Sequence, residues 1–195
     1  MRAWIAVLLS LVVGCAAAKE FVALRQVEFS FDRVSDARVA GIPLAQTRAY
    51  EDVSPLDVAR LALAIAAKDV PLDLTVHVQG RNPETNTVTA RLVALDWSYL
   101  VDGQETVAGT LTRSIAFPPG QPTDVPVGVT FNLVRFFGSD GRTLLDVALS
   151  LAGQRTTSRK VTLRLVPSID TDAGRIRYPV PIDLDLSSGT AGQTR

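Results

Sequence analysis

Most of the chain alternates apolar and polar residues with a period of two, which is typical of β-strands with one buried face. The alternating stretches are 27–31, 72–79, 88–99, 107–117, 125–133 and 161–165. Within 88–99 the apolar phase slips by one residue between Leu92 and Val93. The slip predicts a bulge or a change of sheet partner at this point. Asp102-Gly103 then predicts a tight hairpin turn.

A final alternating stretch, 176–186, carries Pro179 and Pro181 in its outward phase. Proline donates no hydrogen bond to a strand ladder, so we expect this strand at a sheet edge. Seven or more strands with few helices predict a β-sandwich.

Two stretches follow a helical spacing instead. Ser54, Pro55 and Asp57 supply a capping hydroxyl, a proline at the first helical position and an acid in the first turn. We expect this helix to run over 55–68. It is apolar apart from a narrow stripe of Asp57, Arg60 and Lys68. Such a helix covers the end or face of a sheet, or it offers a surface to a lipid or protein partner.

A second helix is predicted over 142–152, ending at Gly153. Its apolar side carries Leu144, Leu145, Ala148 and Leu151. This helix lies between the strand at 125–133 and the closing strands, where we interpret it as an insertion.

Near the N-terminus, Arg2 is followed by a run of apolar or small residues over 3–13. This run leads into Gly14-Cys15. A basic start, a short apolar run and a small residue at the cleavage point are the marks of a secretory signal. The run is too short to span a bilayer, which takes about 20 helical residues. The segment resembles a bacterial lipoprotein signal, which implies cleavage before Cys15 and acylation of its thiol and new amine. Two or three acyl chains hold a protein firmly at a membrane.

The composition fits an exported, folded domain. Cys15 is the single cysteine, so no disulfide forms within the chain. Twenty basic and twenty acidic residues balance, and no electrostatic argument favours nucleic acid. After cleavage about 180 residues remain, the size of one domain.

The stretch 27–133 resembles the WHy (water stress and hypersensitive response) domain of atypical late-embryogenesis-abundant proteins. The resemblance rests on an alternating strand that leads into Asn82-Pro83, on Tyr99 followed by Gly103 in a hairpin, and on a second glycine, Gly109. It implies an all-β fold like immunoglobulin or fibronectin type III domains, and an association with desiccation or stress tolerance. It implies no catalytic site.

Candidate chemistry is sparse. His77, the single histidine, lies on the polar phase of its strand, and we expect a surface residue rather than a general base. Asn82 is expected to close a turn, although a ligand role is an alternative. The stretch 170–174 opens like a calcium loop, but Pro181 stands where the closing glutamate belongs, so we expect a hairpin turn. Asp183 and Asp185 are expected on a solvated strand face.

These observations predict a signal peptide (1–14), a lipidated tether (15–26), a β-sandwich with one or two short helices (27–186) and a flexible tail (187–195). We expect a non-enzymatic envelope lipoprotein that binds or protects envelope components, without cofactor or metal. Ala16 after Cys15 favours the periplasmic face of the outer membrane. The alternative is an accessory protein of an envelope assembly or transport machine, which binds a protein or lipid through 55–68.

Replacing Cys15 with Ser removes the thiol that would carry the lipid. We expect the variant to leave the membrane fraction or to accumulate as uncleaved precursor, as measured by fractionation and palmitate labelling. A variant that fractionates and incorporates palmitate like the parent would contradict the lipoprotein interpretation.

Overall fold

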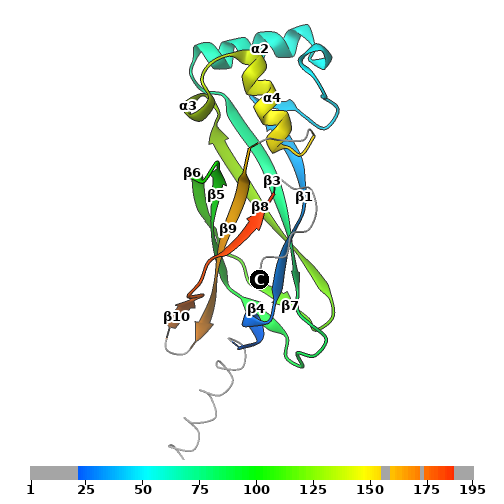
Figure 1. Ribbon diagram of the computed structural model, residues 1–195, viewed down its shortest axis with the longest axis vertical. Helices are drawn as coiled ribbons and strands as arrows, with labels where there is room; N and C mark the ends of the chain where they lie inside the picture. Colours follow the sequence, from blue (N-terminus) through cyan, green and yellow to red (C-terminus); the bar gives the residue numbers. More distant parts are fainter. Residues whose placement is uncertain (1–21, 155–158, 172–173, 187–195) are drawn as a thin grey trace, which may run out of the picture.

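The computed structural model describes residues 22–154, 159–171 and 174–186, and its main strands form two antiparallel sheets packed face to face (Figure 1). The predicted all-β sandwich with short helices is therefore confirmed. The signal peptide, Cys15 and the predicted tail at 187–195 lie outside the described residues.

The strands are β1 (Glu28–Val39), β2 (Ile42–Pro43), β3 (Pro71–Arg81), β4 (Ala90–Leu92), β5 (Ala94–Val101), β6 (Gln104–Leu111), β7 (Ile115–Phe117), β8 (Pro122–Asn132), β9 (Val161–Thr171), β10 (Gly174–Arg177) and β11 (Ile182–Asp185). The helices are the single 3₁₀ turn η1 (Tyr50–Asp52), α2 (Pro55–Ala66), α3 (Val134–Phe137) and α4 (Gly141–Leu151). Residues 22–25 add one helical turn.

One sheet has the order β2-β1-β3-β8; the other has the order β10-β9-β5-β6, with β11 also paired to β9. The strands β1, β3 and β8 share one sheet, whereas β5, β6, β9 and β11 share the other. Splitting consecutive strands between two sheets in this way is typical of immunoglobulin-like sandwiches.

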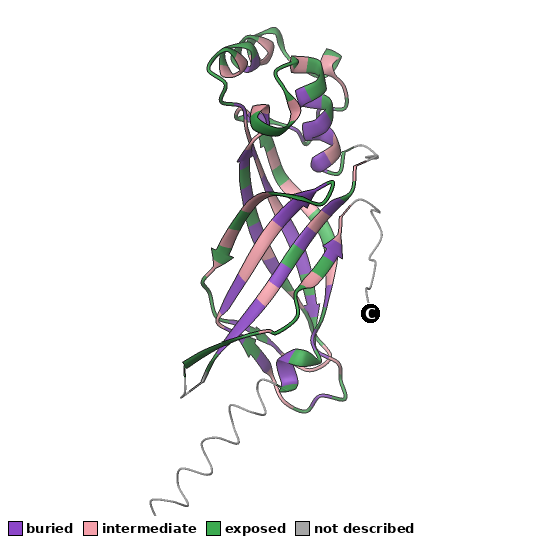
Figure 2. Ribbon diagram, turned by 60° about the vertical axis from the view of Figure 1, so that its left-hand side comes forward, coloured by how far each residue is buried: buried purple, intermediate pink, exposed green. Residues whose placement is uncertain are grey.

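The core lies between the sheets, where the alternation of the sequence places it. On β3 the side chains of Leu72, Leu74, Val76 and Val78 are buried. Their partners on β8 point to the same interior, as Leu74 pairs with Val129 and Val76 with Val127. Figure 2 shows buried residues alternating with exposed ones along the strands.

The phase slip after Leu92 marks a change of sheet partner. Before the slip, β4 pairs with β7 in a separate two-stranded sheet; after it, β5 joins the five-stranded sheet. One residue, Val93, separates the two strands and turns the apolar side of the chain to a new partner. The predicted hairpin is also present: Asp102 and Gly103 have φ values of 53° and 78°, as a type I′ turn requires.

Three expectations need correction. The last strand is not continuous over 176–186, because residues 178–181 interrupt it and leave Ile176 and Val180 exposed. Both halves still lie along the outer edge of β9, as the prolines predicted. The one-turn helix α3 was not anticipated. Finally, Ala23 and Leu24, assigned to the tether, are buried in the core.

The helices gather at one end of the sandwich, and we call η1, α2, α3 and α4 the helical cap (Figure 1). Its inner member is α4. Asp140 caps the start of this helix, and its carboxylate accepts a hydrogen bond from the Thr143 amide at 2.8 Å. The hydrogen bonds from Thr143 lower the pKa of Asp140. The predicted apolar side of α4 is buried, so α4 closes the core at this end.

At the opposite end, Gly80 allows a close approach of an aromatic ring. A Cβ atom at Gly80 would lie 2.3 Å from Cε1 of Phe117. Phe117 is fully buried and packs edge-on against Phe29, with ring centroids 5.6 Å apart. The ring therefore has little room to move.

Gly80→Ala is expected to destabilise the fold by about 1–3 kcal/mol, because the added methyl overpacks the core. Gly128→Ala is the matched control: it lies in β8 with no atom near the added methyl, and we expect little change. Urea unfolding measures both. Phe117→Leu combined with Gly80→Ala should recover part of the loss, and equal midpoints for the two single variants would contradict the packing argument.

Candidate functional site

The helix α2 is well formed but poorly covered. The Ser54 hydroxyl accepts from the Asp57 amide at 3.2 Å, Pro55 is the first helical residue, and Asp57 pairs with Arg60 at 2.9 Å. Its single buried residue is Leu61, and Ile65 approaches Gly141 of α4. The helix covers the end of the sandwich, which was one of the two roles expected from its sequence. It contributes only Leu61 to the core.

The outward side of α2 carries exposed leucines and alanines beside the exposed Arg60. Leu56 and Leu63 are 63% and 72% exposed, and they lie seven residues apart on one side of the helix. Ala59 and Ala66 are exposed on the same side. We call Leu56, Ala59, Leu63 and Ala66 the α2 stripe. In the same cap, Phe136 of α3 is 41% exposed.

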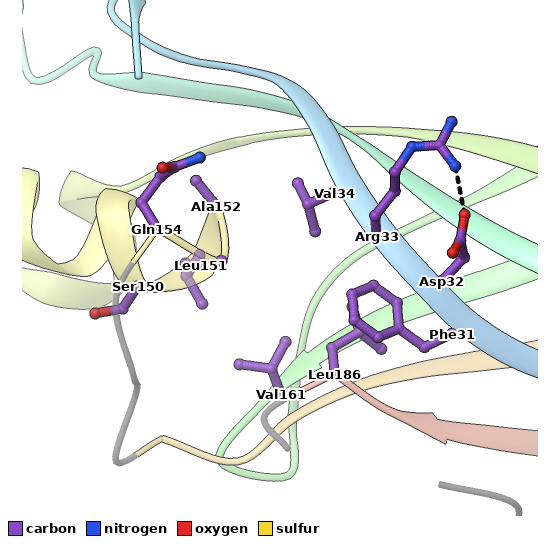
Figure 3. Close-up of a pocket in the computed structure, with 11 residues that line it drawn as sticks. Phe31, Asp32, Arg33, Val34, Ser150, Leu151, Ala152, Gln154, Val161 and Leu186 are labelled. Atoms are coloured by element: carbon purple, nitrogen blue, oxygen red, sulfur yellow. Dashed lines mark hydrogen bonds and ion pairs between the residues drawn. The ribbon is translucent and has the colours of Figure 1, made fainter. Parts of the chain in front are cut away.

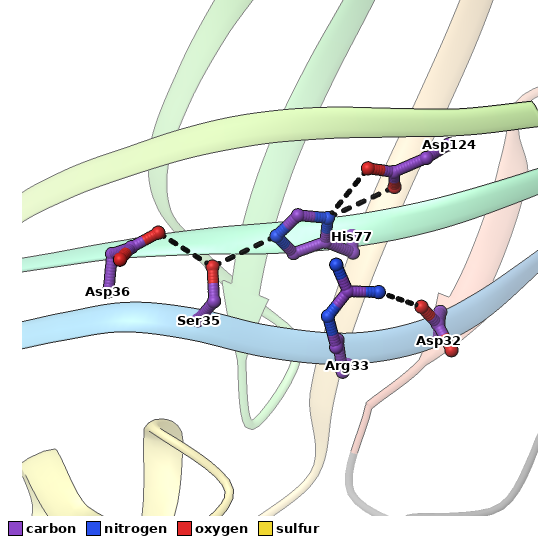
Figure 4. A network of polar contacts seen from close by, with 6 residues as sticks. All are labelled: Asp32, Arg33, Ser35, Asp36, His77 and Asp124. Carbon is purple, nitrogen blue, oxygen red and sulfur yellow. Dashed lines mark hydrogen bonds and ion pairs between the residues drawn. The ribbon is translucent and has the colours of Figure 1, made fainter. Parts of the chain in front are cut away.

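A second cluster involves His77 on the outer face of the β2-β1-β3-β8 sheet (Figure 4). Its Nδ1 lies 2.9 Å from Oδ2 of Asp124 on β8, and its Nε2 lies 2.9 Å from Oγ of Ser35 on β1. The Ser35 hydroxyl donates to Asp36 at 2.8 Å. We call Asp36, Ser35, His77 and Asp124 the polar row.

His77 lies on the predicted outer face, but it is 9% exposed rather than a surface residue. The neighbouring strands β1 and β8 supply the groups that cover it. Sequence periodicity gives the face of a strand and does not reveal which side chains of adjacent strands meet there.

The polar row has the atom order of a Ser-His-Asp triad without the other features of a catalytic site. Oγ of Ser35 lies within hydrogen-bond distance of both the Asp36 carboxylate and Nε2 of His77, so the hydroxyl has two neighbouring partners. His77 also lines none of the three principal cavities of the described residues. The arrangement connects the three strands β1, β3 and β8.

Asn82 is a structural residue. It is fully buried, and its side-chain amide donates to the carbonyls of Val88 and Phe117 at 3.0 and 2.8 Å. Asn86 donates to Oδ1 of Asn82 at 2.8 Å and to the carbonyl of Ala23 at 3.2 Å. The predicted turn is thus also the attachment point of the N-terminal segment, and no local pattern around Asn82 indicates this role.

The remaining candidates lie apart from these clusters. Thr171 pairs with Gly174, as expected for a hairpin, while Asp172 falls outside the described residues. Arg164 binds the Asp183 carboxylate through two hydrogen bonds of 2.8 and 2.9 Å. This guanidinium lowers the pKa of Asp183. Within the described ranges, no group of three His, Cys, Asp or Glu residues is placed to hold a metal ion.

Comparisons with known proteins add little. No protein-family model and no curated protein matches the chain. A solved structure described as "Crystal structure of protein from Archaeoglobus fulgidus" is similar with a TM-score of 0.34 and 9% identity, covering 87% of this chain and 95% of that chain. Of the helices that the structure describes, none has both the length and the apolar character to cross a membrane.

His77→Phe tests the structural role of the polar row. Because Ser35 keeps Asp36 as a partner and the Asp124 side chain is 51% exposed, we expect a loss of stability below about 1 kcal/mol. Asn82→Ala, which leaves buried carbonyls without donors, should cost about 2–3 kcal/mol. Urea unfolding of both variants measures the contrast, and a larger loss for His77→Phe than for Asn82→Ala would contradict it.

Proposed function

We propose that the protein is a lipid-anchored envelope protein that acts by binding rather than by catalysis, and that its helical cap contacts the partner. The observation that carries this proposal is the α2 stripe, where two leucines of a well-capped helix lie more than half exposed. Exposed apolar groups that are grouped on one face are typical of interaction sites.

A protein partner fits the stripe better than a membrane surface. Helices that lie on membranes combine bulky or aromatic apolar residues with a polar face rich in Lys and Arg. The α2 stripe alternates leucine with alanine, and of the two basic residues nearby, Arg60 already pairs with Asp57. Alanines between leucines allow another helix to approach closely.

The two ends of the body support this arrangement. The residues that follow the proposed anchor are docked at the end opposite the cap, where Asn86 holds Ala23 (Figure 1). The seven residues 16–22 span at most about 25 Å when extended. β3 runs from the cap at Pro71 to the opposite end at Arg81, and its eleven residues span about 36 Å. Anchoring at Cys15 thus directs α2 away from the membrane that holds the lipid.

Protection during water stress is the second candidate, and it rests on the resemblance of 27–133 to WHy domains. Within that range Asn82 is buried, and its side chain is hydrogen-bonded to Val88, Phe117 and Asn86. This role and a cap-bound partner are compatible, since a stress protein that binds envelope components also needs a contact surface.

A photoreactive residue at position 63, with the protein in intact envelopes, is expected to give a discrete protein adduct. The added change Leu56→Asp should abolish the adduct, because it places a charge on the same face of α2 as position 63, two helical turns away. Position 180 is the control, since Val180 is 64% exposed far from the cap.

Equal crosslinking at positions 63 and 180, or an adduct that survives Leu56→Asp, would refute the cap as the binding surface. Thermal unfolding should be unchanged in the Leu56→Asp variant, because Leu56 is not part of the core. Survival after drying, compared between cells with the parent and the variant, tests whether the stress role uses the same surface.

A further inference from the structure

The spacing of the α2 stripe is the same in both directions along the helix. From Leu56 the steps to Ala59, Leu63 and Ala66 are three, four and three residues, and leucine alternates with alanine. At 3.6 residues per turn, the four side chains fall within an arc of about 80°. Leu61, the single buried residue of α2, lies on the opposite side of the helix. The stripe therefore faces away from the core.

Reversing the helix exchanges the two residue types of the stripe. We consider a second α2 that lies antiparallel to the first, with the two-fold axis level with Leu61. Leu56 then faces Ala66 of the second copy, and Ala59 faces Leu63 of the second copy. Each layer of the contact joins one leucine to one alanine, so the larger side chains of one helix enter the gaps of the other. The stripe is thus complementary to itself.

A parallel pair of α2 helices lacks this fit. With the two-fold axis along the helices, leucine would face leucine and alanine would face alanine. The distance between two helices depends on the side chains at the contact, so one spacing cannot suit both kinds of layer. The antiparallel pair also places the positive end of each helix dipole beside the negative end of the other.

The charged neighbour of the stripe is compatible with this pairing. Arg60 lies at the edge of the stripe, about 80° from its centre. Its guanidinium is bound to the Asp57 carboxylate of the same helix at 2.9 Å, and the pair carries no net charge. The other residues that flank the stripe are small or apolar, and they allow a close approach: Pro55, Ala62 and Ala67.

We infer that the partner of the α2 stripe is a second copy of this chain, bound through an antiparallel pair of α2 helices. The inference rests on the proposed cap surface and names what binds there. The twelve residues of α2 are about 18 Å long, so the contact is small and belongs to the weak, transient class of interfaces. Its specificity comes from the alternation of leucine and alanine.

An opening beneath the C-terminal end of α4 offers much less apolar surface than the stripe (Figure 3). Its volume is about 260 Å³, and none of the stripe residues lines it. Leu151, Ala152 and Val161 on its wall are each 3% exposed. Gln154 at its rim is exposed and follows the end of α4 that lies away from α2. Position 154 therefore serves as a control within the same end of the molecule.

Photocrosslinking in intact envelopes identifies the partner. Cells express two full-length copies with different C-terminal tags, and one copy carries a photoreactive residue at position 63. We expect an adduct at the mass of two chains that carries both tags. Because position 63 faces Ala59 of the second copy, the attached peptide should be the one that contains Ala59. A photoreactive residue at position 154 should give no such adduct.

Exchanging the residues of one layer tests the pairing itself, with the photoreactive residue moved to position 67 at the edge of the stripe. Ala59→Leu in both copies sets leucine against leucine in the two central layers, and Leu63→Ala in both copies sets alanine against alanine. We expect each to give at least about tenfold less two-tag adduct than the parent, equivalent to a tenfold weaker affinity. One copy with Ala59→Leu and the other with Leu63→Ala restores a leucine–alanine contact in both layers and should recover the adduct.

The outcomes separate this inference from the proposed function. An adduct between position 63 and a different protein would refute the second copy as the partner and leave the cap surface standing, whereas the absence of any protein adduct would refute both. A mixed pair that crosslinks no better than the single variants would contradict the antiparallel arrangement. Urea unfolding establishes that both variants are folded, and we expect unchanged midpoints because Ala59 and Leu63 are exposed.

Discussion

The structure depends on one constraint, the apposition of two inner sheet faces that must both be closed to water along their whole length. Between the ends, the alternating residues of β3 and β8 meet those of β5 and β9. At one end Phe117 and Phe29 fill the space beside Gly80. At the other end α4 completes the closure with six buried side chains. Because α4 covers that end, α2 packs outside it with Leu61 as its single buried residue, and its leucines stay exposed.

The sequence predicted the features that depend on local patterns. Alternation gave the buried faces of β3 and β8, the slip at Val93 gave the change of sheet, and Asp102-Gly103 gave the hairpin. Ser54 and Pro55 gave the start of α2, since capping involves groups within one helical turn.

What the sequence could not predict depends on groups that meet across long separations. In the polar row, His77 meets residues 42 and 47 positions away in sequence, and the Asn82 junction draws its partners from Ala23 to Phe117. The exposure of α2 likewise follows because α4 already covers the end of the core. An apolar helix has the same sequence pattern whether or not another element covers it.

The polar row and the α2 stripe therefore differ in kind. The polar row has suggestive atoms in an arrangement that links strands. The α2 stripe has simple chemistry in an exposed position on the cap. Position, more than residue type, separates what each can do.

The distribution of proline bears on how these molecules behave when crowded together. β8, the outer strand of one sheet, contains Pro122 and Pro126, and the outer edge of the other sheet is divided where Pro179 and Pro181 lie between β10 and β11. An uninterrupted edge could recruit a strand of a neighbouring copy and begin aggregation. These edges lack part of the donors that such growth needs. Growth through these two edges is therefore disfavoured.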